Sequence, residues 1–323
     1  MSKAQALFLD RPSLYPDDLD FSALNDVAHW QDFDSASDIK HCLSETEIIV
    51  SNKVLIDAAV IGDAPRLRLI CIAATGVNNV DIDVARQRGI VVCNVRAYAT
   101  SSVAQHVFSL ILSLGRKLFS YREAVIRGRW SQSPFFCDFE EPIHELDGKT
   151  IGIVGFGDLG QAVAKIARCF GMRILIAHSH NAESRVGESD FQAARVAMPE
   201  LLAESDIISL HCPLTDDNRH LIGAEALSIM RPDAILINTA RGGLIDERAL
   251  LSALEDKQIA AAALDVLEEE PPSGNHPLIN YHADNLIITP HVAWASQQSR
   301  QRLVNEIAKN IEAYSSAQKR NVI

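Results

Sequence analysis

Short apolar runs alternate with amphipathic segments along almost the whole chain, a pattern typical of parallel strands covered by helices. The apolar runs predict strands at 6–9, 48–50, 67–72, 90–93, 150–154, 174–177, 207–210, 234–237, 261–264 and 286–288. Helical spacing predicts helices at 81–88, 161–170, 224–230, 247–255 and 296–314. We therefore expect an α/β protein built on doubly wound parallel sheets.

The strand–helix series is interrupted once, and the interruption predicts two domains. A long helix is expected to begin near residue 100, with Ser101 or Ser102 as its N-cap, and residues 131–142 break into a loop. A new strand–helix series then begins at Thr150. The chain has 323 residues, more than one simple core usually supports. The last helix follows the second series and could return to pack on the first domain.

A glycine-rich turn lies between the expected strand at 150–154 and a helix with one apolar face. Gly155, Gly157 and Gly160 have the spacing G-x-G-x-x-G. In this context the first glycine permits a tight turn, the second lets a pyrophosphate approach the backbone, and the third brings helix and strand close together. The helix N-terminus offers N–H groups to the phosphates. The turn predicts a dinucleotide site, and a turn without a ligand is the alternative.

The next strand lacks the acidic residue that usually follows it in such sites. An Asp or Glu there would hold the 2′-hydroxyl of the adenosine ribose. The sequence has His178, Ser179 and His180 instead, and Ser179, His180 and Arg185 could hydrogen-bond to a 2′-phosphate. NAD(H) and NADP(H) therefore both stay open as the cofactor. No third ligand lies near the two histidines in the sequence, so no metal site is expected.

Three polar side chains, Arg241, Glu270 and His291, follow the last three expected strands. Because ligands bind at the carboxyl ends of strands in an open parallel sheet, the three could converge beside the cofactor. Arg241 can hold a carboxylate and an adjacent carbonyl oxygen through paired N–H donors. His291 can protonate that carbonyl oxygen as hydride arrives, and Glu270 can hydrogen-bond the other ring nitrogen. Taken singly, His291 could instead be a histidine of the hydrophobic core, and Glu270 could belong to a solvated acidic turn.

Composition narrows the possible functions. The net charge of −12 argues against a nucleic-acid partner, which requires a basic surface. Polar residues interrupt the apolar run at 103–119, so it is not expected to span a membrane. The short apolar stretch near the N-terminus ends at Asp10 and is interpreted as a strand, not a signal peptide. The six cysteines form no C-x-x-C pair, which is typical of buried, reduced thiols in a cytoplasmic protein.

The chain resembles the D-isomer-specific 2-hydroxyacid dehydrogenases over nearly its whole length. The matching segments are A-T-G-V-N-N-V-D (74–81), S-V-A-Q-H (102–106), V-G-F-G-D-L-G-Q (154–161), L-H-C-P-L-T (210–215), I-N-T-A-R-G-G-L-I-D (237–246), A-L-D-V-L-E-E-E-P (263–271) and T-P-H-V-A-W-A-S (289–296). The resemblance implies that Arg241, Glu270 and His291 are catalytic. It also implies that Asp265 lies near the nicotinamide.

The resemblance further implies two domains with different tasks. Residues 1–99 and 295–323 would form a flavodoxin-like substrate-binding domain, and residues 100–294 a Rossmann-like dinucleotide-binding domain whose helical arm makes a homodimer. The implied substrate-binding residues are Ser51, Asn52, Thr75, Gly76, Val77 and Arg241. The implied cofactor-binding residues are Val103, Gly155, Gly157, Asp158, Leu159, Gly160, His178, Ser179, Pro213, Asn218, Thr239, Ala240, Arg241, Asp265, His291 and Ala293.

Segments 103–106, 129–137 and 291–295 most resemble the glycerate dehydrogenase/hydroxypyruvate reductase branch. The implied reaction is the reduction of hydroxypyruvate or glyoxylate by NADH or NADPH to the D-hydroxy acid. The alternatives are a D-lactate or phosphoglycerate type of dehydrogenase, or a dinucleotide-sensing scaffold like the corepressor relatives. One departure is Arg96, which replaces the family's usual proline and could alter the domain crossing or place a cation near the cleft.

Overall fold

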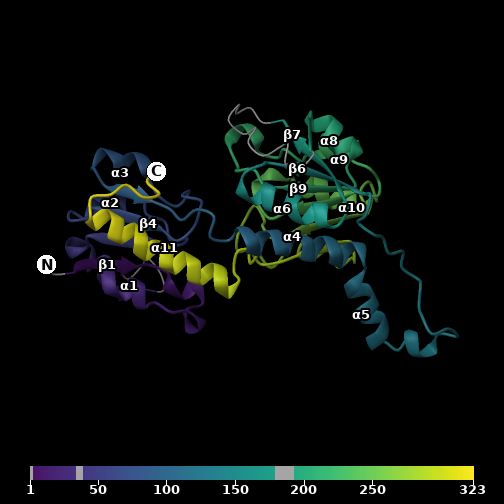
Figure 1. The fold of residues 1–323 in the computed structure, drawn as a ribbon, viewed down its shortest axis with the longest axis horizontal. Helices are drawn as coiled ribbons and strands as arrows, with labels where there is room; N and C mark the ends of the chain where they lie inside the picture. The colour runs from purple at the N-terminus through teal and green to yellow at the C-terminus, as the bar shows by residue number, and fades with distance from the viewer. Residues whose placement is uncertain (1–2, 34–38, 179–192) are drawn as a thin grey trace. The chain divides into compact units, whose positions relative to one another are not determined.

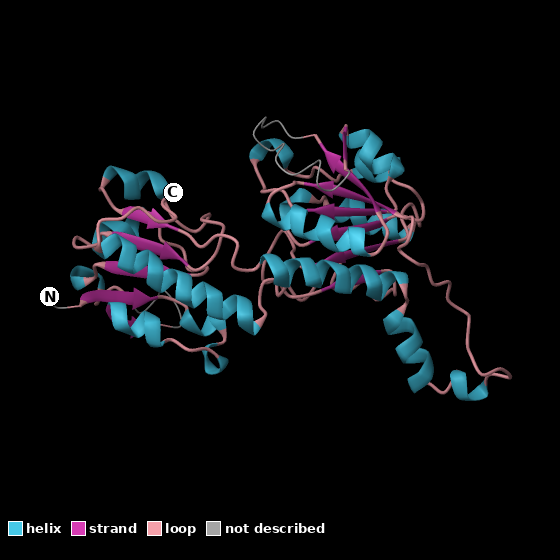
Figure 2. Cartoon of the chain, in the orientation of Figure 1, coloured by secondary structure: helices cyan, strands magenta, loops and turns pink. Residues whose placement is uncertain are grey.

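The computed structural model describes residues 3–33, 39–178 and 193–323 of the chain. It divides into two compact units, one formed by Met1–Ala99 with Trp294–Ile323 and the other by Thr100–Ala293. Within the described ranges, each unit contains one sheet whose strands are all parallel, with helices on both of its faces (Figures 1 and 2).

The first unit has a sheet with the strand order β2-β1-β3-β4-β5, which is the order of flavodoxin-like folds. Its strands are β1 (Ala4–Phe8), β2 (Ala28–Asp32), β3 (Ile48–Ser51), β4 (Leu69–Ile72) and β5 (Val91–Cys93). Its helices are α1 (Ser22–Val27), α2 (Ala58–Asp63), α3 (Ile82–Gln87) and α11 (Gln297–Ser315). Every residue of β3 and β4 is buried, so these strands were readable as continuous apolar runs.

The last helix belongs to this first unit. Ser296 is the N-cap of α11, and its hydroxyl accepts a hydrogen bond from the Ser299 backbone N–H. The guanidinium of Arg300, only 8% exposed, binds both carboxylate oxygens of Asp18 at 2.6 and 2.8 Å. The Gln301 side chain contacts the backbone of Asp20. These contacts tie the end of the chain to its beginning.

The second unit has a sheet with the strand order β12-β11-β10-β9-β6-β7-β8, a Rossmann order with one additional strand. Its strands are β6 (Thr150–Val154), β7 (Arg173–Ala177), β8 (Ala194–Val196), β9 (Ile207–Leu210), β10 (Ile235–Asn238), β11 (Ala261–Leu264) and β12 (Leu286–Ile288). Its helices are α4 (Thr100–Gly115), α5 (Leu118–Ile126), α6 (Asp158–Cys169), α8 (Met198–Glu204), α9 (Ala224–Ile229) and α10 (Glu247–Glu255). The predicted α/β class is confirmed.

The apolar pattern of the sequence did not predict two of the strands, and both lie at a sheet edge. β2 pairs only with β1 and has a single buried residue, while β8 pairs only with β7 and has three residues. A strand at a sheet edge needs neither a long apolar run nor strict alternation, because one of its sides has no neighbouring strand. The apolar pattern therefore did not reveal them.

The long helix α4 begins earlier than its serines suggest. Ser101 and Ser102 lie inside its first turn, so the prediction that one of them is the N-cap is wrong. The Ser102 hydroxyl instead donates a hydrogen bond to the carbonyl oxygen of Ala293 at 2.7 Å. A contact between residues so distant in the chain leaves no local sequence pattern.

All six cysteines are free thiols, but only Cys71 and Cys93 are buried. The expectation of buried thiols is wrong for the other four, of which Cys169 is exposed. Cys71 and Cys93 face each other across β4 and β5, and their Sγ atoms are 3.2 Å apart. Burial and the neighbouring thiol raise the pKa of Cys71, with the hydrogen bond to Cys93 as the larger cause.

In the part of the chain that the structure describes, no helix has both the length and the apolar character that crossing a membrane requires.

Candidate active site

The glycine turn connects β6 to α6, and its three glycines differ in the space around them. Gly155 has φ +97°, and a Cβ built on it would lie 2.5 Å from the Cys212 backbone nitrogen. A Cβ on Gly160 would lie 2.2 Å from the Gly155 carbonyl oxygen. A Cβ on Gly157, by contrast, would have no described atom within 4 Å. Two glycines are thus required by packing, and the middle one leaves its backbone open.

This geometry fits the pyrophosphate of a dinucleotide. Gly157 is the N-cap of α6 and makes no side-chain capping hydrogen bond. The first N–H groups of the twelve-residue helix, which begins with Asp158 and Leu159, can therefore be offered to an anionic group. Such an anion would lie above the open backbone of Gly157.

The adenosine end of such a site would lie at the end of β7. His178 is exposed there, and its backbone N–H donates to the carbonyl oxygen of Val196 at 2.9 Å. Ser179, His180 and Arg185 lie outside the described residues. Arg195, which was not a candidate, extends a guanidinium N–H to the Ala177 carbonyl oxygen at 2.9 Å. It was missed because its strand, β8, was not predicted.

The loops after β9 and β10 are held by their own side chains. The Asn218 side chain accepts from the Thr215 backbone N–H at 2.7 Å and donates to the Pro213 carbonyl oxygen at 2.8 Å. Asn238 is fully buried, and its side chain binds the backbone of Ala240 and Arg241. These amides give both loops a fixed shape beside the glycine turn. Thr239 lies in the second loop, and its Oγ1 is buried with no hydrogen-bond partner among the described residues.

Arg241 follows β10 at the point where two strand ends pack closely. Its Nη1 atom donates to the Ala240 carbonyl oxygen at 2.6 Å. A Cβ on Gly242 would lie 1.9 Å from the carbonyl carbon of Leu267, in the loop after β11. Only a glycine next to Arg241 therefore permits this approach of the two loops.

His291 and Glu270 are in direct contact. The Nδ1 atom of His291 lies 2.6 Å from Oε2 of Glu270, and the two side chains are 28% and 33% exposed. The other carboxylate oxygen of Glu270 accepts from the Leu267 backbone N–H at 3.0 Å. The backbone of His291 has φ +54°, a conformation that non-glycine residues rarely adopt. The carboxylate is thus oriented by the backbone and faces the imidazole.

Asp265 holds the loop that carries His291. Its carboxylate is 1% exposed and accepts from the Thr289 hydroxyl at 2.5 Å, the Val292 N–H at 2.9 Å and the Ala293 N–H at 2.8 Å. Its carbonyl oxygen accepts from the His291 N–H at 2.8 Å. Asp265 therefore fixes the backbone on both sides of His291.

The three predicted catalytic residues follow neighbouring strands. In the parallel register Asn238 pairs with Leu264 and Leu264 with Ile288, so β10, β11 and β12 end at the same level of the sheet. Arg241, Glu270 and His291 come directly after these ends, and Val103 is buried on α4. The structure thus brings together Glu270 and His291 in contact, with Arg241 after the adjacent strand.

Apart from Arg241, the predicted substrate residues belong to the first unit. Ser51 and Asn52 are 0% and 5% exposed, and their side chains bind the Val54 carbonyl oxygen and the Ser13 hydroxyl. Asp10 accepts hydrogen bonds from the backbone N–H groups of Asn52 and Lys53. These side chains are therefore used to shape the loop after β3.

The loop after β4 is more accessible. Thr75 is exposed, its hydroxyl donates to the Val95 carbonyl oxygen at 2.9 Å, and Gly76 and Val77 are half-buried. Arg96 follows β5 and is exposed. Among the predicted substrate residues of this unit, those at 75–77 are thus more accessible than Ser51 and Asn52.

Comparison with known proteins places this site in a family. Residues 108–293 match the model of the D-isomer specific 2-hydroxyacid dehydrogenase, NAD binding domain. Glycerate dehydrogenase of Methylorubrum extorquens is 40% identical over 319 residues, which cover 99% of this chain and 98% of the relative. Hydroxypyruvate reductase of Blautia hydrogenotrophica is 35% identical, covering 98% of each chain.

The chain belongs to the D-isomer-specific 2-hydroxyacid dehydrogenase family.

Solved structures of similar proteins agree with this. An acyclic imino acid reductase in complex with NADPH and D-Arg superposes with a TM-score of 0.85 at 30% identity, covering 99% of both chains. A D-lactate dehydrogenase from Aquifex aeolicus, complexed with NAD and lactic acid, has a TM-score of 0.83 at 30% identity and covers 97% of this chain and 96% of that one. The predicted family, enzymatic activity and nicotinamide cofactor are confirmed.

A second histidine of the dehydrogenase lies near the glycine turn. The Nε2 atom of His211 is 2.8 Å from the Ser209 hydroxyl, and its Nδ1 is buried without a hydrogen-bond partner among the described residues. Removal of the ring from water lowers the pKa of His211 to about 4. His211 is therefore neutral at neutral pH. It was not a candidate from the sequence.

Replacing single glycines should separate cofactor binding from folding. Gly157→Ala should leave the melting temperature nearly unchanged, because the added Cβ meets no described atom. It should raise the Kd for NADH or NADPH at least about tenfold, because the methyl group occupies the approach of the pyrophosphate. Calorimetric titration measures this. Gly160→Ala is the matched comparison and should lower the melting temperature, and an unchanged Kd in Gly157→Ala would contradict the assignment.

The neutral His211 should make the protein less stable in acid. Its folded pKa, about 4, lies below its ordinary value of 6.5, so the unfolded chain binds the proton first as the pH falls. The stabilisation is complete above pH 6.5 and is lost toward pH 4, by up to about 3 kcal/mol. Urea denaturation from pH 7 to 4.5 should show that the free energy of unfolding falls less in His211→Gln than in wild type. The control His144→Gln, at an exposed position, should behave like wild type. If the free energy of unfolding depended equally on pH in all three proteins, the prediction would be refuted.

Proposed function

We propose that this dehydrogenase reduces hydroxypyruvate or glyoxylate to the corresponding D-hydroxy acid. The observation that carries the proposal is the contact of 2.6 Å between His291 and Glu270, which follow the adjacent strands β12 and β11. Relatives named glycerate dehydrogenase and hydroxypyruvate reductase, and a glyoxylate reductase from Aeropyrum pernix that is 40% identical over 263 residues, support the choice of substrate.

His291 is assigned as the general acid and base. Because Nδ1 contacts Glu270, Nε2 is the ring nitrogen assigned to proton exchange with the substrate oxygen. The Glu270 carboxylate orients the ring through its contact with Nδ1. Proton transfer by a positioned group of this kind contributes about 10²–10⁴-fold to the rate.

Arg241 is assigned to the substrate carboxylate and the adjacent carbonyl oxygen. Its guanidinium presents paired donors that match two oxygen atoms, which an ammonium cannot do. By withdrawing electron density from the carbonyl group, it prepares the carbon for hydride. The bound dinucleotide supplies that hydride. The glycine turn, His178, Asn218, Thr239, Asp265 and Ala293 are assigned to hold it.

The first unit is assigned to substrate binding. The backbone N–H groups at 75–77 are proposed to receive the substrate carboxylate, since this loop is the accessible part of the predicted set. Ser51 and Asn52 are then assigned to shaping the neighbouring loop, because both side chains are buried and already hydrogen-bonded. We further infer a cytoplasmic location, which the six free cysteines support.

A D-lactate type of activity is the second candidate. The observation that favours it is the structural similarity to a D-lactate dehydrogenase across 97% of this chain. A kinetic comparison of hydroxypyruvate, glyoxylate and pyruvate, each with NADH and NADPH, distinguishes the two. The proposal expects the highest kcat/KM with hydroxypyruvate or glyoxylate, and a preference for pyruvate would select the second candidate.

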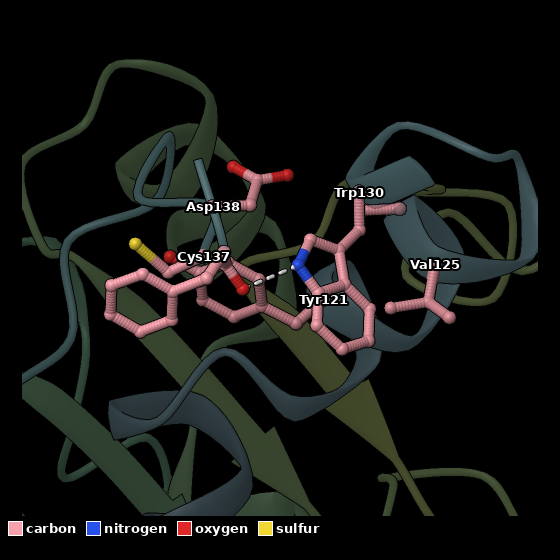
Figure 3. A pocket seen from close by; sticks show the side chains of 7 residues that line it. Tyr121, Val125, Trp130, Cys137 and Asp138 are labelled. Atoms are coloured by element: carbon pink, nitrogen blue, oxygen red, sulfur yellow. Dashed lines mark hydrogen bonds between the residues drawn. The ribbon is translucent and has the colours of Figure 1, made fainter. Parts of the chain in front are cut away.

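The helical arm of the second unit is proposed to form a homodimer. Helix α5 and the segment after it expose large apolar side chains, among them Phe119 at 57%, Ile126 at 60% and Phe136 at 90%. Figure 3 shows Tyr121, Val125 and Trp130 around a hollow at this place, with the Trp130 indole N–H donating to the Phe136 carbonyl oxygen. An apolar patch of this kind marks a protein–protein interface.

Removing the proton donor should separate chemistry from binding. His291→Ala should lower kcat about 10²–10⁴-fold, while the Kd for the dinucleotide stays within about twofold, because the imidazole acts on the substrate oxygen. Stopped-flow reduction of hydroxypyruvate and calorimetric titration measure the two quantities. A variant with wild-type kcat would show that His291 is not the acid. Absence of turnover by the wild-type protein on all three 2-oxo acids would overturn the proposed function.

The dimer should depend on the apolar arm. Phe119→Glu combined with Ile126→Glu should halve the mass measured by light scattering, because burying two carboxylates in an apolar interface is costly. Leu55→Glu is the matched control, since Leu55 is similarly exposed at 58% but lies in the first unit. A wild-type protein that is monomeric at micromolar concentration would contradict the dimer.

A further inference from the structure

Three side chains form a hydrogen-bonded chain behind the His291 loop. His106 lies on α4, Thr289 follows β12, and Asp265 follows β11. The Nε2 atom of His106 is 3.0 Å from Oγ1 of Thr289, which is 2.5 Å from Oδ1 of Asp265, and the same Nε2 atom lies 3.6 Å from Oδ1 itself. His106 is 20% exposed at its side chain and Asp265 1%, so the chain runs from near the surface of the unit into its interior.

The donors in this chain can be assigned from chemistry. Both carboxylate oxygens of Asp265 accept backbone N–H groups, from Val292 and Ala293, so the carboxylate is the acceptor. The single hydroxyl proton of Thr289 is therefore donated to Asp265, and the short distance is typical of a hydroxyl on a carboxylate. The Thr289 oxygen retains only acceptor capacity toward His106. His106 must then carry its proton on Nε2.

The chain ends on the residue that fixes the proposed acid. Asp265 binds the backbone at 291, 292 and 293, and His291 is held at φ +54°. A non-glycine residue keeps such a conformation only when its surroundings impose it. Helix α4 makes a second contact with this loop, because Ser102 donates to the Ala293 carbonyl oxygen. The helix thus contacts the loop on both sides of His291.

We propose that His106 is a positioning residue for His291. By donating to Thr289, it holds the hydroxyl in the orientation that donates to Asp265, and Asp265 in turn sets the backbone of the His291 loop. The inference rests on the proposed function, in which His291 exchanges a proton with the substrate. No contact of His106 with substrate or dinucleotide is required.

The test combines kinetics with hydrogen exchange on the full-length enzyme. His106→Leu removes the donor and retains an apolar side chain, while His106→Gln retains an N–H donor at a similar reach. We expect His106→Leu to lower kcat for hydroxypyruvate about tenfold, less than the hundredfold that a displacement of about 1 Å costs. The Kd for the dinucleotide should stay within about twofold. His106→Gln should recover most of kcat, and the exposed His282→Leu is the matched control.

The exchange measurement tests the same chain without reference to catalysis. The backbone N–H groups of Val292 and Ala293 should exchange with deuterium faster in His106→Leu than in wild type, and His106→Gln should restore their protection. In the double variant His106→Leu/Thr289→Val, kcat should be no lower than in Thr289→Val alone, because both substitutions break one chain.

Several outcomes would overturn the proposal. If the backbone N–H groups at 292–293 exchanged at the wild-type rate in His106→Leu, His106 would not hold this loop, whatever the activity. If they exchanged faster while kcat stayed unchanged, His106 would hold the loop but would not position His291. If the losses of kcat caused by His106→Leu and Thr289→Val combined in full in the double variant, the two residues would act independently. Should wild type reduce no 2-oxo acid, the proposed function fails, and the exchange arm still decides whether His106 holds this loop.

Discussion

The parallel register of β10, β11 and β12 is the constraint on which the site depends. Three strands that end at one level deliver their following residues to one edge of the sheet, however far apart these lie in the sequence. Gly242 then permits the loops after β10 and β11 to approach more closely than any side chain would allow. Arg241 and the Glu270–His291 pair therefore follow strand ends at one edge of the sheet.

A buried carboxylate is costly unless its oxygens are satisfied, and Asp265 shows how the cost is offset. Three donors reach it, two from the backbone of the His291 loop and one from Thr289. The same bonds that stabilise the charge also determine the path of the loop. Stability and the placement of the proposed acid therefore depend on one group.

The sequence predicted those features that have a local cause. Buried strands such as β6, β9 and β11 have the predicted bounds, since a strand covered on both faces is a continuous apolar run. The glycine turn was readable because its three glycines have a fixed spacing between a strand and a helix, although the steric demand on Gly155 comes from Cys212. Ser102, Arg195 and His106 were missed as interacting groups, because their partners lie on other elements. Only the tertiary fold shows what they contact.

The two histidines near this edge of the sheet show why a motif alone does not define an acid. His211 lies beside the glycine turn, but among the described residues its ring has only a hydroxyl as hydrogen-bond partner, and its removal from water lowers its pKa to about 4. Such a group has no proton to give at neutral pH. His291 faces the Glu270 carboxylate at 2.6 Å, which fixes the orientation of its ring. The partner that the fold provides, more than the residue type, therefore distinguishes the imidazole suited to proton transfer from the one that is structural.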